Sequence, residues 1–250
     1  MRIAVTLATL ASTLALAVRG QINPQLSLWW VFLPLVVAAP GQAVDTIVRA
    51  MHTHRAPLRE DDRRDIQQLA TQALQDVARY GNIDITKVGV CVWVPGTVKP
   101  FLWKPRLLRV VRFRLDTAAA KPSDVDWVMG KGTIGEAWRS RRLQHKDWRA
   151  IANRHPGRLT DEQWTQIPTE TKSGFTQEEF EEVRDKYAEV LAVPIVDSHS
   201  ANVFYGVLSI DLPMDAVPAD QTSRLELRAV QTKAKAAADT VALTLKHRRV

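Results

Sequence analysis

The chain has 250 residues, of which 46% are hydrophobic and 24% charged, and its formal net charge is +7 at pH 7. This length and composition suit one or two domains with a packed core, and the positive charge favours acidic partners such as lipid headgroups or nucleic acid. The single cysteine, Cys91, excludes a disulfide framework within one chain and a zinc site built from several cysteines.

Two apolar segments, 3–18 and 26–39, open the sequence, and their flanks extend them toward the length that spans a bilayer. Arginines flank the pair on both sides, whereas the short connection holds only Arg19. Because positive residues stay on the cytoplasmic side, we expect a transmembrane helical hairpin over 1–48 with both ends inside, followed by a juxtamembrane linker over 49–59. The lipid bilayer is then a partner, and the rest of the chain is cytoplasmic at the cell membrane.

A secretory signal peptide is the alternative interpretation of the first segment. Arg2 gives it a basic start, and Ala15-Leu16-Ala17 resembles an A-x-A cleavage site. The second segment favours the uncleaved hairpin, because a cleaved product would still carry an apolar stretch.

From Glu60 the pattern becomes helical, with apolar residues recurring every three or four positions as far as Tyr80, and Gly81 is suited to end the helix. The segment 88–95 follows, β-branched and apolar on both faces. This pattern predicts a central strand.

Three further strands are expected. In 109–115 apolar residues alternate with arginines, as in a half-buried strand. The segments 190–197 and 203–211 are apolar and joined by a short polar turn, so they predict an antiparallel hairpin. Gly206 within the last strand indicates a bulge or a close backbone approach.

The polar interval from about 144 to 180 predicts two short helices, one of them starting near Thr160. The chain finishes in a long helix over roughly 221–247 with a thin, alanine-rich stripe. That stripe suits packing on the sheet or on a second copy of itself in a coiled coil.

Residues 130–135 contain three glycines spaced as G-x-G-x-x-G. A dinucleotide fingerprint would follow a buried strand, but here the preceding residues are polar and include a proline. The glycines therefore predict a turn with positive φ and close helix packing. An anion at the helix N-terminus, assisted by Lys131, is the alternative.

Together with two later segments, these glycines resemble the GAF domain family. The family's G-x-G-hydrophobic-x-G-x-A stretch is matched by Gly130, Gly132, Ile134, Gly135 and Ala137, its Val-Pro strand by 193–195, and its Gly-Val-Leu strand by 206–208. The resemblance implies an α+β fold with a GAF-like central antiparallel sheet flanked by helices. It covers most of the predicted domain, 60–250, with the polar interval as an insert around 144–180.

GAF domains generally sense small molecules or mediate dimer contacts, and most are not enzymes. The residue set of the cyclic-nucleotide members cannot be placed here, and the bilin-binding members need an exposed cysteine, whereas Cys91 lies in mid-strand. The methionine-sulfoxide-reducing members rely on several cysteines. The resemblance therefore implies a module that is not an enzyme and needs no cofactor or metal.

Tryptophans can wall a cavity for a small molecule, with an arginine near its mouth. The candidate ligand-binding residues are Trp93, Arg112, Trp127, Lys131, Gly132, Trp138 and Tyr205. Plain core packing is the alternative for each tryptophan. The basic strand also suits nucleic acid, but beside a membrane it more readily meets anionic lipid or water, so nucleic acid is not expected.

These features favour a membrane-tethered cytoplasmic sensory or regulatory module that binds a small molecule and signals through a homodimer or a partner protein. The alternatives are a ligand-free scaffold that dimerises through its helices and an unrecognised enzyme.

Overall fold

The computed structural model describes residues 60–96, 105–116, 123, 125–198, 200, 203–216 and 223–246, all within one unit of the chain, Leu58–Val250. The predicted transmembrane hairpin over 1–48 and the linker over 49–59 lie outside the described residues. None of the described helices combines the length and apolarity needed to traverse a bilayer.

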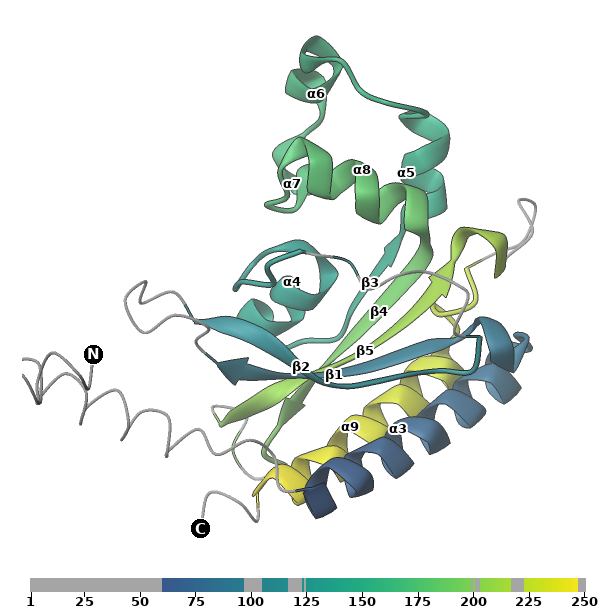
Figure 1. Cartoon of the computed structure of the whole chain (residues 1–250), viewed down its shortest axis with the longest axis vertical. Coiled ribbons are helices and arrows are strands. Elements are labelled where there is room, and N and C mark those ends of the chain that lie inside the picture. Colours follow the sequence, from purple (N-terminus) through teal and green to yellow (C-terminus); the bar gives the residue numbers. More distant parts are fainter. Residues whose placement is uncertain are drawn as a thin grey trace, which may run out of the picture. The chain divides into compact units, whose positions relative to one another are not determined.

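Five antiparallel strands form one sheet in the order β2-β1-β5-β4-β3 (Figure 1). They are β1 (Gly89–Gly96), β2 (Arg106–Arg114), β3 (Gln144–Asp147), β4 (Tyr187–Val196) and β5 (Phe204–Pro213). The four predicted strands are confirmed, and the last two pair as expected. The α+β architecture with a central antiparallel sheet is likewise confirmed, whereas β3 was not predicted.

Two long helices, α3 (Glu60–Gly81) and α9 (Arg228–Lys246), run side by side across one face of the sheet (Figure 1). Their apolar stripes, including Ile66 and Val77 of α3 and Val230 and Val241 of α9, are buried against the apolar side chains of that face. The sheet and α3 thus cover the alanine-rich stripe of α9 within the chain. The small alanine side chains let α9 approach these neighbours closely.

The opposite face of the sheet is covered by shorter helices (Figure 1). These are α4 (Gly132–Ser140), α5 (Trp148–Arg154) and α8 (Gln177–Lys186), with α6 (Asp161–Gln166) and α7 (Thr169–Lys172) farther from the sheet. The polar interval therefore holds a strand and more helices than the two expected. One begins at Thr160 as predicted, since Thr160 and Gln163 form a reciprocal capping box. Single 3-10 turns, η1 (Ile85–Lys87) and η2 (Met214–Ala216), complete the described elements.

A register shift in the pairing of β4 and β5 changes the face of the sheet on which Tyr205 lies. The register shifts between Ile195 and Val196, so Tyr205 turns to the same face as Leu208 and packs in the α3/α9 core. A Cβ on Gly206 would overlap the carbonyl oxygen of Trp93 on β1. The predicted bulge and close backbone approach at Gly206 are both confirmed.

Candidate ligand-binding site

The glycine motif builds the turn that seats α4 against the rest of the domain. Gly130 and Gly132 have φ values of +84° and +57°, which glycine adopts without the steric cost of a side chain. A Cβ on Gly135 would overlap the carbonyl oxygen of Val128. The predicted roles, positive φ and close helix packing, are confirmed.

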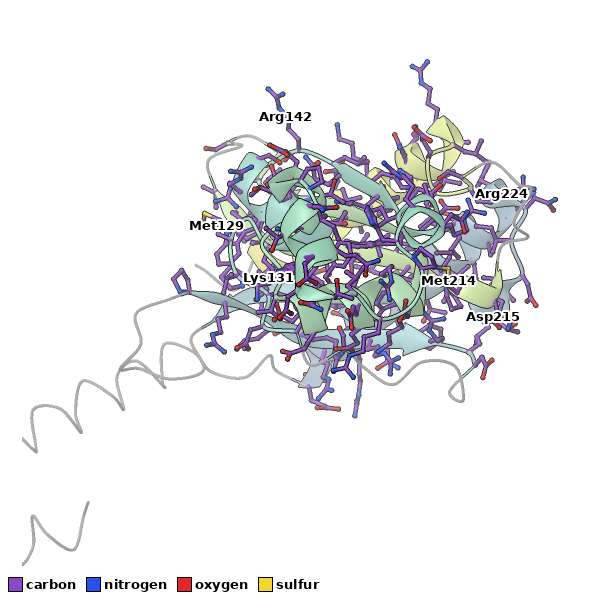
Figure 2. All side chains as sticks on the ribbon, turned by 90° about the horizontal axis from the view of Figure 1, so that it is seen from above. Met129, Lys131, Arg142, Met214, Asp215 and Arg224 are labelled. Carbon is purple, nitrogen blue, oxygen red and sulfur yellow. The ribbon has the colours of Figure 1, made fainter. Side chains whose placement is uncertain are left out.

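Lys131, at the start of α4, is already paired with a carboxylate. Its Nζ donates to both carboxylate oxygens of Glu179 on α8, at 2.8 and 2.9 Å, and the N–H of Gly132 donates to the carbonyl oxygen of Ser173 at 2.7 Å. By contrast, Arg142, just beyond α4, extends away from the ribbon in Figure 2. Lys131, which the alternative interpretation assigned to an anion, therefore joins α4 to α8.

Aromatic side chains pack on the sheet face opposite α3 and α9 and surround a small cavity. Trp93 of β1 meets Trp127 with ring centroids 5.9 Å apart, and Phe175 lies 5.9 Å from both Trp127 and Trp148. These four rings line a cavity of about 30 Å³. That is close to the volume of one water in the liquid, and far below the ~300–1,000 Å³ of ordinary ligand pockets.

Polar groups on three residues that line this cavity are buried without a hydrogen-bond partner among the described residues. They are the indole N–H groups of Trp127 and Trp148 and the hydroxyl of Thr133. The indole of Trp93 differs, because its N–H donates to Ser209 Oγ at 2.8 Å. A buried polar group left unsatisfied costs about 1–3 kcal/mol, so such a cluster requires an explanation.

Charged side chains also line the cavity. Arg109 and Arg112 come from β2, and Asp211 of β5 forms an ion pair with Arg114, whose side chain is 5% exposed. Burial raises the pKa of the Asp211 carboxyl, while Arg114 and Arg112 act in the opposite direction. The Arg109 guanidinium lies 5.6 Å from the centroid of the Trp93 ring. Two arginines thus face the cavity together with a carboxylate that a third arginine already pairs.

Cys91 lines the same cavity, and its thiol is free and buried. Burial, assisted by the negative charge of Asp211, raises the pKa of the thiol to about 12. The thiol therefore stays protonated near neutral pH, whereas a reactive cysteine needs a lowered pKa. Cys91 thus lies within β1, as its place in the sequence indicated, and it is buried.

A larger hollow of about 460 Å³ lies outside the aromatic cavity, along α4, β3 and α7. Its cations have partners: Arg139 pairs with Glu136 at 2.8 Å, and Lys146 Nζ donates to Ser173 Oγ at 2.8 Å. Thr133 lines both this hollow and the aromatic cavity. The two spaces therefore approach each other at the first turn of α4.

The structure brings several of the predicted ligand-binding residues together. Trp93, Arg112 and Trp127 line the aromatic cavity. Gly132 lies beside it, because a Cβ there would overlap the ring of Phe175 and come within 2.9 Å of the Trp127 ring. Sequence periodicity and the glycine motif thus pointed to one region of the fold.

Three predicted residues lie elsewhere. Lys131 is paired with Glu179, as described above, and Trp138 stacks on Phe204 with centroids 5.9 Å apart and an interplanar angle of 7°. The Tyr205 hydroxyl donates to Asp197 at 3.1 Å on the α3/α9 side of the sheet. The bulge at Gly206 is the physical reason, since a regular strand would have turned Tyr205 toward the cavity.

The sequence did not single out Thr133, Trp148 or Asp211. Trp148 lies in the polar interval, where no periodicity marks a buried position. Asp211 and Ser209 alternate with apolar residues along β5, and polar residues on one face of an otherwise apolar strand are the signal that could have found them.

No protein-family model matches the sequence, and no curated protein was found to match it. Solved structures similar to this chain include the GAF domain region of a predicted membrane protein from Geobacter sulfurreducens PCA, with 16% identity, a TM-score of 0.45, and coverage of 75% of this chain and 97% of that one. A predicted GAF sensor protein from Burkholderia vietnamiensis has 16% identity and a TM-score of 0.35 over 74% of this chain and 98% of that one. The reduced form of fRMsr of Staphylococcus aureus has 15% identity and a TM-score of 0.36 over 73% and 94%.

These likenesses are likenesses of fold alone. The GAF-like fold predicted from the sequence motifs is confirmed by the architecture of the described residues, in which a five-stranded antiparallel sheet is flanked by helices and the glycine motif opens α4.

Proposed function

We propose that this chain is a sensory or regulatory module whose GAF-like domain binds a small molecule in the aromatic cavity. One observation carries the proposal: the unpartnered N–H and O–H groups of Trp127, Trp148 and Thr133 belong to residues that line the same cavity. Leaving these groups without hydrogen bonds costs about 1–3 kcal/mol each, and core packing alone does not offset that cost. A ligand that bonds to them recovers that cost.

Binding is coupled to a change of shape in this proposal. Trp148 and Phe175 lie in the segment between α4 and α8, and Trp93 and Trp127 close the other side of the cavity. Because the cavity holds only about 30 Å³, a ligand larger than a water enters only when this segment shifts against the sheet. Such a shift is the kind of change that a regulatory domain can transmit.

The remaining parts of the proposal come from the sequence. The predicted hairpin over 1–48 tethers the module to the cell membrane with the domain in the cytoplasm, and the signal leaves through a homodimer or a partner protein. In this proposal the module binds its ligand without transforming it, and the cavity thiol of Cys91, with its pKa raised to about 12, is poorly suited to act as a nucleophile.

A ligand-free scaffold is the second candidate. The small volume of the cavity favours it, because four aromatic rings already fill most of the space. In that case the unpartnered groups bind ordered water instead of a metabolite.

Native mass spectrometry of the purified full-length chain separates the two candidates. For a sensor we expect a small molecule bound to the folded chain that is released on unfolding. A chain with no bound molecule, which also takes up none from a metabolite extract, would favour the scaffold.

A further inference from the structure

The unpartnered groups at the aromatic cavity also indicate a class of ligand, an inference that rests on the proposed function. An indole N–H donates a hydrogen bond and cannot accept one. Trp127 and Trp148 therefore require lone pairs from whatever enters the cavity, and the Thr133 hydroxyl can donate as well. The three residues are only 7%, 1% and 7% exposed, so bulk water does not satisfy them.

The charges around the cavity favour a negative ligand. Arg109 and Arg112 line it, whereas the carboxylate of Asp211 is neutralised by its ion pair with Arg114. An anion is therefore attracted by two guanidinium groups. A cation is less favoured, because the carboxylate of Asp211 that would pair with it already pairs with Arg114.

The rings are arranged poorly for a cation. Trp127 meets Trp93 and Phe175 edge to face, at interplanar angles of 64° and 80°, and Arg109 already lies over the Trp93 ring. A quaternary ammonium needs several exposed ring faces around it. Here the edges of rings, which carry partial positive charge, take part in the packing.

The size of the cavity restricts the part of the ligand that enters it. The cavity of about 30 Å³ holds about one water, so a compact group of few atoms requires the smallest shift of the segment between α4 and α8. We propose that the cavity binds the carboxylate of a small organic acid, whose two oxygens accept from the indole N–H groups of Trp127 and Trp148, with Thr133 as a third donor.

The test uses the full-length chain, ¹⁵N-labelled and refolded from denaturant to release any bound molecule. Its eight tryptophans give separate indole N–H signals in NMR spectra, and Trp127→Phe and Trp148→Phe assign two of them while keeping an aromatic ring. The probes are sodium formate, sodium acetate, acetamide and tetramethylammonium chloride, at matched ionic strength. Trp164→Phe is the control, because Trp164 packs on Phe180 and does not line the cavity.

We expect formate and acetate to shift the Trp127 and Trp148 signals in a saturable way. Each of the two variants should bind formate about tenfold more weakly or worse, since a hydrogen bond to a charged group is lost, and Trp164→Phe should bind it unchanged. If acetamide or tetramethylammonium shifts both signals and the carboxylates do not, the inference is overturned while the proposed function stands. If no probe shifts them, the inference also fails, and the mass spectrum of the native chain then decides separately whether the cavity holds any ligand.

Discussion

Gly135 shows how a single residue positions the site. A Cβ there would overlap the carbonyl oxygen of Val128 and lie 3.1 Å from the backbone nitrogen of Gly130, and neither backbone atom can move without the turn. We expect Gly135→Ala to lower the free energy of unfolding by about 2–3 kcal/mol, because overpacking costs about 1–3 kcal/mol and backbone yields least. Urea denaturation of the purified variant measures the change.

Gly157→Ala is the matched control for Gly135→Ala. Gly157 has a φ of +68°, and no atom lies within 4 Å of where its Cβ would be. Only the strain of a left-handed backbone remains, about 1 kcal/mol. A Gly135→Ala variant as stable as the wild type would show that close packing of α4 is not what requires glycine at 135.

How far the sequence predicts single site residues depends on what marks them. The glycines at 130, 132 and 135 were predictable because spacing alone marks a turn, and Trp93 because it lies on a clearly apolar strand. Trp148 was not, since its burial depends on α8 packing over it, which no local pattern encodes. Tyr205 lies on the α3/α9 side of the sheet because a bulge reverses which face a strand residue lies on without changing the strand's composition.

Glu189 joins several elements through one buried carboxylate. Glu189 lies on β4 and has no exposed surface. Its carboxylate accepts hydrogen bonds from the backbone N–H groups of Arg224 and Leu225, just before α9, at 3.0 and 2.9 Å. Arg149 of α5 donates to it at 3.3 Å. We expect Glu189→Gln to lower the free energy of unfolding by about 3 kcal/mol, because removing one partner of a buried ion pair leaves the other uncompensated.

The control for Glu189→Gln is Glu182→Gln. Glu182 pairs with Lys186 on the surface of α8 at 3.6 Å and its side chain is 41% exposed, so its loss should change stability by no more than about 0.5 kcal/mol. A Glu189 variant as stable as the Glu182 variant would contradict the view that this carboxylate holds β4, α5 and the start of α9 together. Denaturation monitored by circular dichroism makes the comparison.

Among the helices and strands, those with a clear periodicity or run of apolar residues could be predicted from the sequence. The apolar stripe of α3 and the apolar run of β1 each had one interpretation. The strand β3 was missed because its four residues are polar and half-buried, and only pairing with β4 makes them a strand. Tertiary pairing overrides local preference in such short edge strands.

Glu189 contributes to the stability of the domain toward acid. Burial alone would raise the pKa of its carboxyl, but hydrogen bonds from His145, Ser223 and two backbone N–H groups outweigh burial and lower the pKa from 4.5 to about 2. A carboxyl whose pKa is lower in the folded chain than in the unfolded chain stabilises the folded state at pH values above the unfolded-state pKa. This stability is lost as pH falls from about 4.5 toward 2. The loss attributable to this group is about 3 kcal/mol.

Unfolding free energies of the wild type and Glu189→Gln between pH 6 and pH 2 isolate this contribution. We expect the difference between the two proteins to shrink as pH falls through this window, because other titrating groups are common to both. A constant difference across the window would mean that the Glu189 carboxylate is not held in its charged form.

The central claim for the whole molecule is that the polar groups at the aromatic cavity are kept for a ligand at a cost to the empty protein. The most direct measurement is the free energy of unfolding of ligand-free Thr133→Val, which replaces the unpartnered hydroxyl by a methyl group of similar shape. We predict that this variant is more stable than the wild type by about 1 kcal/mol or more, since an unsatisfied buried group is removed. A variant that is equally or less stable would show that the hydroxyl is already bonded in the empty domain, and would contradict the claim.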